Sequence, residues 1–133
     1  MNNQISIIIV DDNEIDLLIA KRLLSRVNPY IKVETFASGL ELSSWMRTRT
    51  SDDYLETTIF LIDIYMPQSN GYNVAQEVQE IFAIYSNQAI CYMLSATIDF
   101  LERAKVENDS NVTGFIGKPI TVATYNSILS KFS

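Results

Sequence analysis

The stretch Thr58-Ile59-Phe60-Leu61-Ile62-Asp63 decides how this chain folds. A short apolar run rich in β-branched and aromatic residues is typical of a strand that is buried on both faces, as in a parallel sheet. A carboxylate at the end of such a strand loses part of its hydration, which costs free energy unless a partner compensates for it. Asp63 is therefore the first candidate for a functional residue.

The same arrangement, an apolar run followed by polar residues, recurs along the chain. Ile5–Val10 is followed by Asp11-Asp12, Ala89–Leu94 by Ser95-Ala96-Thr97, and the short run Val112–Ile116 by Lys118-Pro119. Ile31–Phe36 alternates in polarity and predicts one further strand. Because the carboxyl ends of parallel strands meet at one edge of a sheet, we expect these polar residues to form a single site.

Helical patterns separate the strands. Ile15, Ile19 and Leu23 recur every four residues and predict a helix from about Glu14 to Val27. Similar patterns predict helices over Gly39–Arg49, around Val74 to Tyr85, from Phe100 (with Asp99 as its cap) to about Glu107, and from Val122 to Phe132. Thr50–Thr57 and Pro67–Gly71 are expected to be loops.

Five strand–helix pairs predict an α/β fold, a doubly wound (βα)5 parallel sheet of five strands. The flavodoxin-like strand order 2-1-3-4-5 fits the pattern best. That order places the switch point between the first and third strands, where Asp11, Asp12 and Asp63 would meet.

Size and composition limit the possible functions. A chain of 133 residues suits one domain, 1–133, with no output domain attached. The net charge of −6 leaves no basic surplus for phosphates, which argues against direct DNA binding. No apolar run is long enough to span a membrane, so we expect a cytoplasmic protein. The lone Cys91 lies in a predicted buried strand and is expected to be a core residue.

The chain contains no histidine. Catalysis by Ser-His-Asp or Cys-His groups and zinc sites with histidine ligands are therefore excluded. The chain also cannot be the histidine donor of a phosphorelay.

The polar motifs together resemble the receiver domain of two-component response regulators. The matching residues are Asp11-Asp12, Asp63 with Met66-Pro67 and Gly71, Ser95-Ala96, Phe115 and Lys118-Pro119, and the resemblance runs roughly from Ile5 to Phe132. It implies a stand-alone, chemotaxis-regulator-like receiver that is not a conventional enzyme. A histidine kinase or histidine phosphotransfer protein would phosphorylate it on Asp63.

Three carboxylates in one cleft raise each other's pKa values, so a cation is expected among them. Oxygen ligands of this kind suit Mg²⁺. The resemblance implies that Asp12 and Asp63 ligate the ion directly with the backbone carbonyl of Tyr65, while Asp11 acts through water. Simple helix capping is the alternative interpretation of Asp11-Asp12.

The remaining motif residues would serve the phosphoryl group. Asp63 is expected to be the nucleophile that forms an acyl phosphate, and Lys118 is expected to supply a positive charge. By resemblance, Ser95 donates a hydrogen bond to the phosphoryl group, Ala96 leaves its approach clear, Phe115 moves with Ser95 as a switch, and Pro119 follows a cis peptide bond. The alternatives are a solvated lysine, a turn serine and an ordinary core aromatic.

The resemblance also implies two interaction surfaces. The face formed by the predicted elements from Asp99 to Phe132 would contact a downstream protein target. The helix from Glu14 to Val27 would dock the phosphodonor.

Three other kinds of protein share part of this pattern. A phosphatase of the haloacid dehalogenase type needs a second acid two residues after the nucleophile, where this chain has Tyr65, and a nucleophile on its first strand. A flavodoxin needs a loop rich in Ser, Thr and Gly after the first strand, and Asp11-Asp12 would repel a flavin phosphate. An inert receiver-like scaffold is disfavoured because every acceptor-site residue is present.

Overall fold

A five-stranded parallel sheet forms the centre of the computed structural model, which describes residues 5–49, 56–67, 69–85, 87, 89–96 and 100–132. The strands are β1 (Ile5–Val10), β2 (Lys32–Phe36), β3 (Thr57–Asp63), β6 (Ile90–Ser95) and β7 (Gly114–Gly117). Their order is β2-β1-β3-β6-β7. In chain order this is 2-1-3-4-5, so the predicted flavodoxin-like sheet is confirmed.

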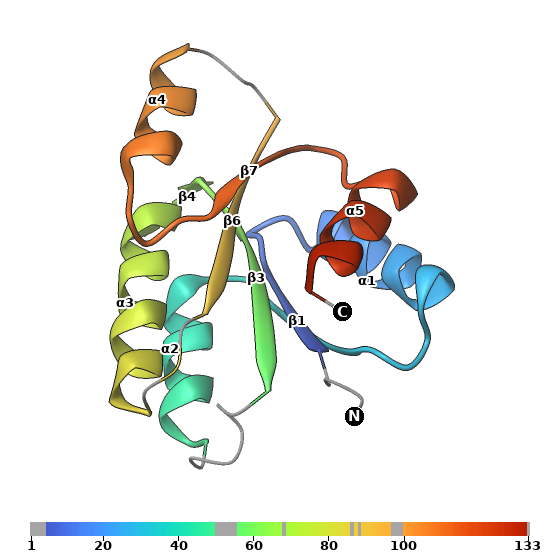
Figure 1. Ribbon diagram of the computed structural model, residues 1–133, viewed down its shortest axis with the longest axis horizontal. Helices are drawn as coiled ribbons and strands as arrows, with labels where there is room; N and C mark the ends of the chain where they lie inside the picture. The colour runs from blue at the N-terminus through green and yellow to red at the C-terminus, as the bar shows by residue number, and fades with distance from the viewer. Residues whose placement is uncertain are drawn as a thin grey trace.

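Helices cover both faces of this sheet (Figure 1). They are α1 (Glu14–Val27), α2 (Gly39–Arg47), α3 (Gly71–Ile84), α4 (Phe100–Asn108) and α5 (Val122–Phe132). In Figure 1, α1 and α5 lie on one side of the sheet, and α2 and α3 lie on the other. Among the described residues, no helix is both long and apolar enough to cross a membrane.

Strand β3 divides the core into two halves. Phe60 and Ile62 belong to the cluster on the α2 and α3 side, whereas Ile59 and Leu61 belong to the cluster on the α1 and α5 side. Successive side chains of a strand point to opposite faces, so an uninterrupted apolar run fills both halves. Cys91 is buried in the first cluster, as expected, and burial raises the pKa of its thiol to about 12.

Helix α1 has the predicted bounds, but two of the three residues that predicted it, Ile15 and Ile19, lie outside its buried face, and only Leu23 packs partly against the core. Leu17, Ala20 and Leu24 are buried, whereas Ile15 is 69% and Ile19 is 57% exposed. The helix carries apolar residues on two sides, and only packing against α5 and the sheet decides which side is covered.

The connection after β3 is more regular than the loop expected over Pro67–Gly71. Two short strands, β4 (Tyr65–Met66) and β5 (Ser69–Asn70), pair antiparallel there. The Asn70 side chain then caps α3 by accepting a hydrogen bond from the Asn73 N–H at 2.9 Å. The predicted Asp99 cap and most of the 50–57 loop lie outside the described residues.

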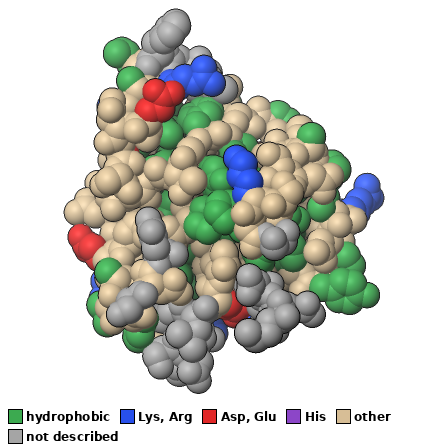
Figure 2. Space-filling model, in the orientation of Figure 1, with side chains coloured by type: hydrophobic (Ala, Val, Ile, Leu, Met, Phe, Trp, Pro, Cys, Tyr) green, Lys and Arg blue, Asp and Glu red, His purple; other side chains and the backbone are tan. Residues whose placement is uncertain are grey.

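The edge strand β7 lies between α4 and α5 in Figure 1. Figure 2 has the same orientation as Figure 1. It shows hydrophobic side chains gathered near the centre of the face that is turned to the viewer. The strand itself is shorter and begins later than the predicted run, because Gly114 rather than Val112 pairs first with β6.

Candidate functional site

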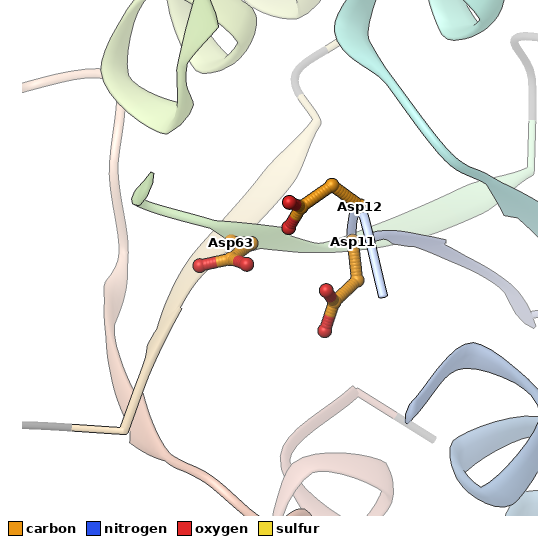
Figure 3. Close-up of side chains that lie close together, drawn as sticks. All are labelled: Asp11, Asp12 and Asp63. Carbon is orange, nitrogen blue, oxygen red and sulfur yellow. The ribbon is translucent and has the colours of Figure 1, made fainter. Parts of the chain in front are cut away.

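Three acidic residues meet at the carboxyl edge of the sheet. Asp11 and Asp12 follow β1, and Asp63 ends the neighbouring strand β3. One carboxylate oxygen from each acid lies within 4.8 Å of those of the other two. Figure 3 shows the Asp12 carboxylate pointing toward Asp63 and the Asp11 carboxylate beside them.

The three carboxylates have different surroundings. Asp11 is 2% and Asp63 is 6% exposed, whereas Asp12 is exposed to solvent. Backbone N–H groups orient the two buried acids: Asn13 donates to Asp11 Oδ1 at 2.9 Å and Tyr65 donates to Asp63 Oδ1 at 3.2 Å. Asn13, not Asp12, is the side-chain cap of α1, so capping does not account for the Asp12 carboxylate.

Lys118, just after β7, brings one positive charge to this cluster. Its Nζ lies 2.7 Å from Asp11 Oδ2 and 3.1 Å from Asp63 Oδ2. Its backbone N–H donates to the Ser95 carbonyl at 2.9 Å, which ties the loop to the end of β6. The Lys118–Pro119 peptide bond is cis. The side chain is largely covered and contacts the acids directly, so it is not a solvated loop lysine.

The pKa values reflect this uneven balance of charge. Burial raises the pKa of Asp63 above its ordinary value, and the charge of Asp11 adds to the rise, although the hydrogen bond from Lys118 opposes it. Burial disfavours the charged form of Lys118, but its hydrogen bonds to Asp11 and Asp63 outweigh this and raise its pKa. One ammonium group is therefore shared among several acids.

This donor set fits a small divalent cation. The three acids offer only hard oxygen ligands, their oxygens converge, and Lys118 compensates for only part of their charge. Mg²⁺ prefers carboxylate oxygens combined with waters, and the exposed position of Asp12 leaves one side of the cluster open to water.

Ser95 and Ala96 lie on the far side of Asp63. Asp63 pairs with Leu94 in the sheet, so Ser95, the buried last residue of β6, lies one position beyond it. Ala96 is exposed and lines a cleft of about 300 Å³ together with Lys118 and Asp11.

Phe115 lies on β7, where it pairs with Met93. Its half-buried ring packs against the core cluster on the α2 and α3 side, so the aromatic points inward. A movement of this ring stays a prediction.

Sequence reasoning missed two acidic residues close to the site. Asp16 Oδ2 on α1 lies 3.9 Å from Lys118 Nζ. Glu102 on α4 accepts a hydrogen bond from the hydroxyl of Tyr65, two residues after Asp63. The spacing of Asp16 from Asp12, one helical turn, was a weak signal for the first, whereas no local pattern links Glu102 to Tyr65.

Comparison with known proteins agrees with this geometry. The family model for the response regulator receiver domain matches residues 7–129. A solved two-component response regulator from Cytophaga hutchinsonii is 22% identical, with 98% of each chain covered and a TM-score of 0.84. A response regulator receiver protein from Dyadobacter fermentans is 23% identical, with 96% of this chain and 97% of that chain covered and a TM-score of 0.79.

A third similar structure is a Saccharomyces cerevisiae complex of a histidine phosphotransfer signalling protein with the receiver domain of its downstream response regulator. The matching chain of that structure is 16% identical to this chain. The match covers 99% of this chain and 90% of that chain, with a TM-score of 0.77. The structural likenesses show a shared fold, and the family match extends over nearly the whole chain. This chain therefore belongs to the response regulator receiver domain family.

Proposed function

We propose that this receiver domain accepts a phosphoryl group on Asp63 from a histidine kinase or a histidine phosphotransfer protein. It then signals or relays through protein contacts that depend on phosphorylation. The observation that carries the proposal is the position of Asp63, buried at the end of β3, hydrogen-bonded to Lys118 and converging with Asp11 and Asp12. Members of the family are signalling proteins, and nothing in the match supports the phosphatase alternative.

The transfer is a nucleophilic substitution at phosphorus. A carboxylate oxygen of Asp63 attacks the phosphorus of a phosphohistidine, and the new P–O bond forms as the P–N bond breaks. The electron pair of the P–N bond leaves with the imidazole nitrogen, which takes up a proton from water. Lys118 places its charge beside the phosphoryl oxygens, Ser95 donates a hydrogen bond to one of them, and the small Ala96 leaves their approach clear.

Asp12, Asp63 and the backbone carbonyl of Tyr65 would hold Mg²⁺, with Asp11 acting through water. When bound, the ion would neutralise part of the charge on the nonbridging phosphoryl oxygens. Asp11 also fixes Lys118 through the 2.7 Å ion pair, so the ammonium group stays beside the acceptor.

The acceptor role is tested with Mg²⁺ and acetyl phosphate, a small acyl-phosphate donor. Intact mass spectrometry is expected to show one phosphoryl adduct that is lost at high pH, and Asp63→Asn should carry none. Omission of Mg²⁺ should slow the labelling strongly. If the wild type stays unlabelled although Mg²⁺ binds, the proposal is wrong and the inert-scaffold interpretation gains.

The exposed side of α1 is the surface we assign to the phosphodonor. Ile15, Leu18 and Ile19 are exposed there, and Ile19 also lines the cleft that contains Asp11 and Lys118. A donor protein with an apolar surface would cover this patch while its phosphohistidine reaches Asp63. The complex of a related receiver domain with a histidine phosphotransfer protein supports a donor of this class.

A substitution on α1 separates docking from chemistry. Ile19→Asp should label with acetyl phosphate at close to the wild-type rate but accept phosphoryl groups poorly from histidine kinases and phosphotransfer proteins. Leu40→Asp is the matched control, because Leu40 is also an exposed apolar residue but lies on α2. Equal rates of phosphoryl transfer to both variants would show that the donor does not dock on α1.

The face formed by α4, β7 and α5 is proposed as the contact for a downstream target. The centre of this face carries the hydrophobic side chains visible in Figure 2, and Leu101 on α4 and Val122 on α5 are exposed. A partner that prefers phosphorylated protein should lose affinity when Leu101 is replaced by Asp, while labelling of Asp63 continues.

A further inference from the structure

The described side chains of helix α4 bury little apolar surface. Among residues 101–108, the part of the helix whose side chains the structure describes, Val106 alone is buried. Figure 1 shows α4 at one end of the molecule, beyond α3 in this view. In residues 101–108, polar contacts are therefore an important part of what ties the helix to its neighbours.

Glu102 makes the most specific of these contacts. Its Oε1 accepts a hydrogen bond from the Tyr65 hydroxyl, and its Oε2 accepts one from the Tyr72 hydroxyl at 2.9 Å. Both oxygens of one carboxylate are thus engaged by phenols from two different elements. Hydrogen bonds to a charged acceptor are stronger than those between neutral groups.

The two tyrosines connect Glu102 to different parts of the molecule. Tyr72 lies in the first turn of α3, where Lys105 of α4 also approaches its ring at 5.9 Å from the centroid. Tyr65 lies on β4, and its backbone N–H donates to Asp63 Oδ1 at 3.2 Å. Through a single residue, Tyr65, the carboxylate of Asp63 is connected to helix α4.

We propose that Glu102 is a positioning residue for the acceptor, acting through Tyr65 to hold the loop whose N–H orients the Asp63 carboxylate. The proposal rests on the phosphoacceptor function and assigns to it Glu102, a residue of α4 that accepts a hydrogen bond from Tyr65. Binding linkage is reciprocal, so a change in the charge and ligands of Asp63 also shifts the position of α4. The contact thus couples the acceptor to one edge of the target-binding face.

Two phenylalanine substitutions distinguish positioning from simple anchoring. Tyr65→Phe and Tyr72→Phe each remove one hydroxyl and one hydrogen bond to Glu102, so they loosen α4 to a similar degree. Only Tyr65→Phe breaks the connection to Asp63. We expect labelling by acetyl phosphate with Mg²⁺ to slow about fivefold in Tyr65→Phe. Tyr72→Phe and the exposed control Tyr30→Phe should label like the wild type.

Glu102→Met, which has no oxygen to accept from Tyr65, completes the test. It should slow labelling about as much as Tyr65→Phe, and the double variant should be no slower than either single one, because both substitutions remove the same hydrogen bond. Urea denaturation of each variant shows whether a loss of folding contributes. Equal rates in Tyr65→Phe and Tyr72→Phe, or additive losses in the double variant, would overturn the proposal.

A second measurement uses beryllium fluoride with Mg²⁺ as a phosphoryl mimic. In the wild type, the mimic should change amide hydrogen exchange in residues 101–108. The change should be absent in Tyr65→Phe and retained in Tyr30→Phe, and its persistence in Tyr65→Phe would contradict the coupling. If the wild type forms no adduct at all, the phosphoacceptor function itself fails, and the positioning role falls with it.

Discussion

Lys118 Nζ lies 2.7 Å from Asp11 Oδ2 but 3.1 Å from Asp63 Oδ2, so the lysine is bound more closely to the acid that is not the proposed acceptor. Asp11 thereby anchors the ammonium group whatever happens to the charge of Asp63. The acceptor carboxylate shares its cation and keeps a pKa above the ordinary value, mainly because it is buried.

Replacement of Lys118 by Met should destabilise the fold at pH 7. The substitution leaves two buried carboxylates without their cation, and breaking a buried ion pair costs roughly 3 kcal/mol. The free energy of unfolding from urea titrations in EDTA measures this loss. Lys118→Arg, which keeps the charge, should lose much less, and an equal loss in both would point to packing rather than charge.

The raised pKa of Asp63 predicts a pH-dependent stability. Protonated Asp63 stabilises the folded state at pH values below the ordinary carboxyl pKa near 3.8. This stabilisation is lost as the pH rises through the higher pKa of the folded state. Asp63→Asn lacks this loss and should therefore be more stable than the wild type at pH 7 in EDTA.

The difference in unfolding free energy between Asp63→Asn and the wild type should shrink as the pH is lowered toward 4. Urea titrations over this range provide the measurement. Glu107→Gln, on the exposed side of α4, serves as the control and should follow the wild type. A constant offset of Asp63→Asn at every pH would show that its effect does not come from titration.

Gly71 is required by a close approach of two backbone segments. A Cβ atom there would lie 2.7 Å from the Asp63 carbonyl oxygen and 3.1 Å from Ile64 Cα. Gly71→Ala should therefore displace the acceptor loop, cost about 1–3 kcal/mol of stability and slow Asp63 labelling. At Gly114 the new atom would meet only the Tyr92 ring at 3.2 Å, so Gly114→Ala should cost less and label normally.

Gln79 ties α3 to two backbone segments. Its Nε2 donates to the carbonyls of Ala89 at 2.6 Å and Asn111 at 3.1 Å, and its Oε1 accepts from the Ala89 N–H. Gln79→Met would leave these backbone groups unpaired and should lower the unfolding free energy by about 2–3 kcal/mol. Gln76→Met, which removes only an exposed bond to Glu80, should change it little in the same urea titration.

Strands were predicted well where burial on both faces required continuous apolar runs. The β3 run and its neighbours are of this kind, and β1 begins and ends where its pattern does. Helix α1 was predicted from three residues of which two, Ile15 and Ile19, do not face the core, because a four-residue repeat indicates a helix but not which side of it is covered. The β4–β5 pair was missed because two-residue strands leave no periodic pattern.

The pattern of apolar and polar residues was enough to predict the alternation of strands and helices, and with it the edge of the sheet at which Asp11, Asp12, Asp63 and Lys118 were expected. Neighbouring residues are enough for this prediction, because they show both the spacing of apolar residues and the point at which each strand ends. Three contacts could be known from the folded chain alone: Lys118 pairs more closely with Asp11, Asp16 approaches the same lysine, and Glu102 accepts a hydrogen bond from Tyr65. These contacts join residues that are far apart in the chain. They depend on how the helices and strands pack against one another, which no local sequence pattern shows.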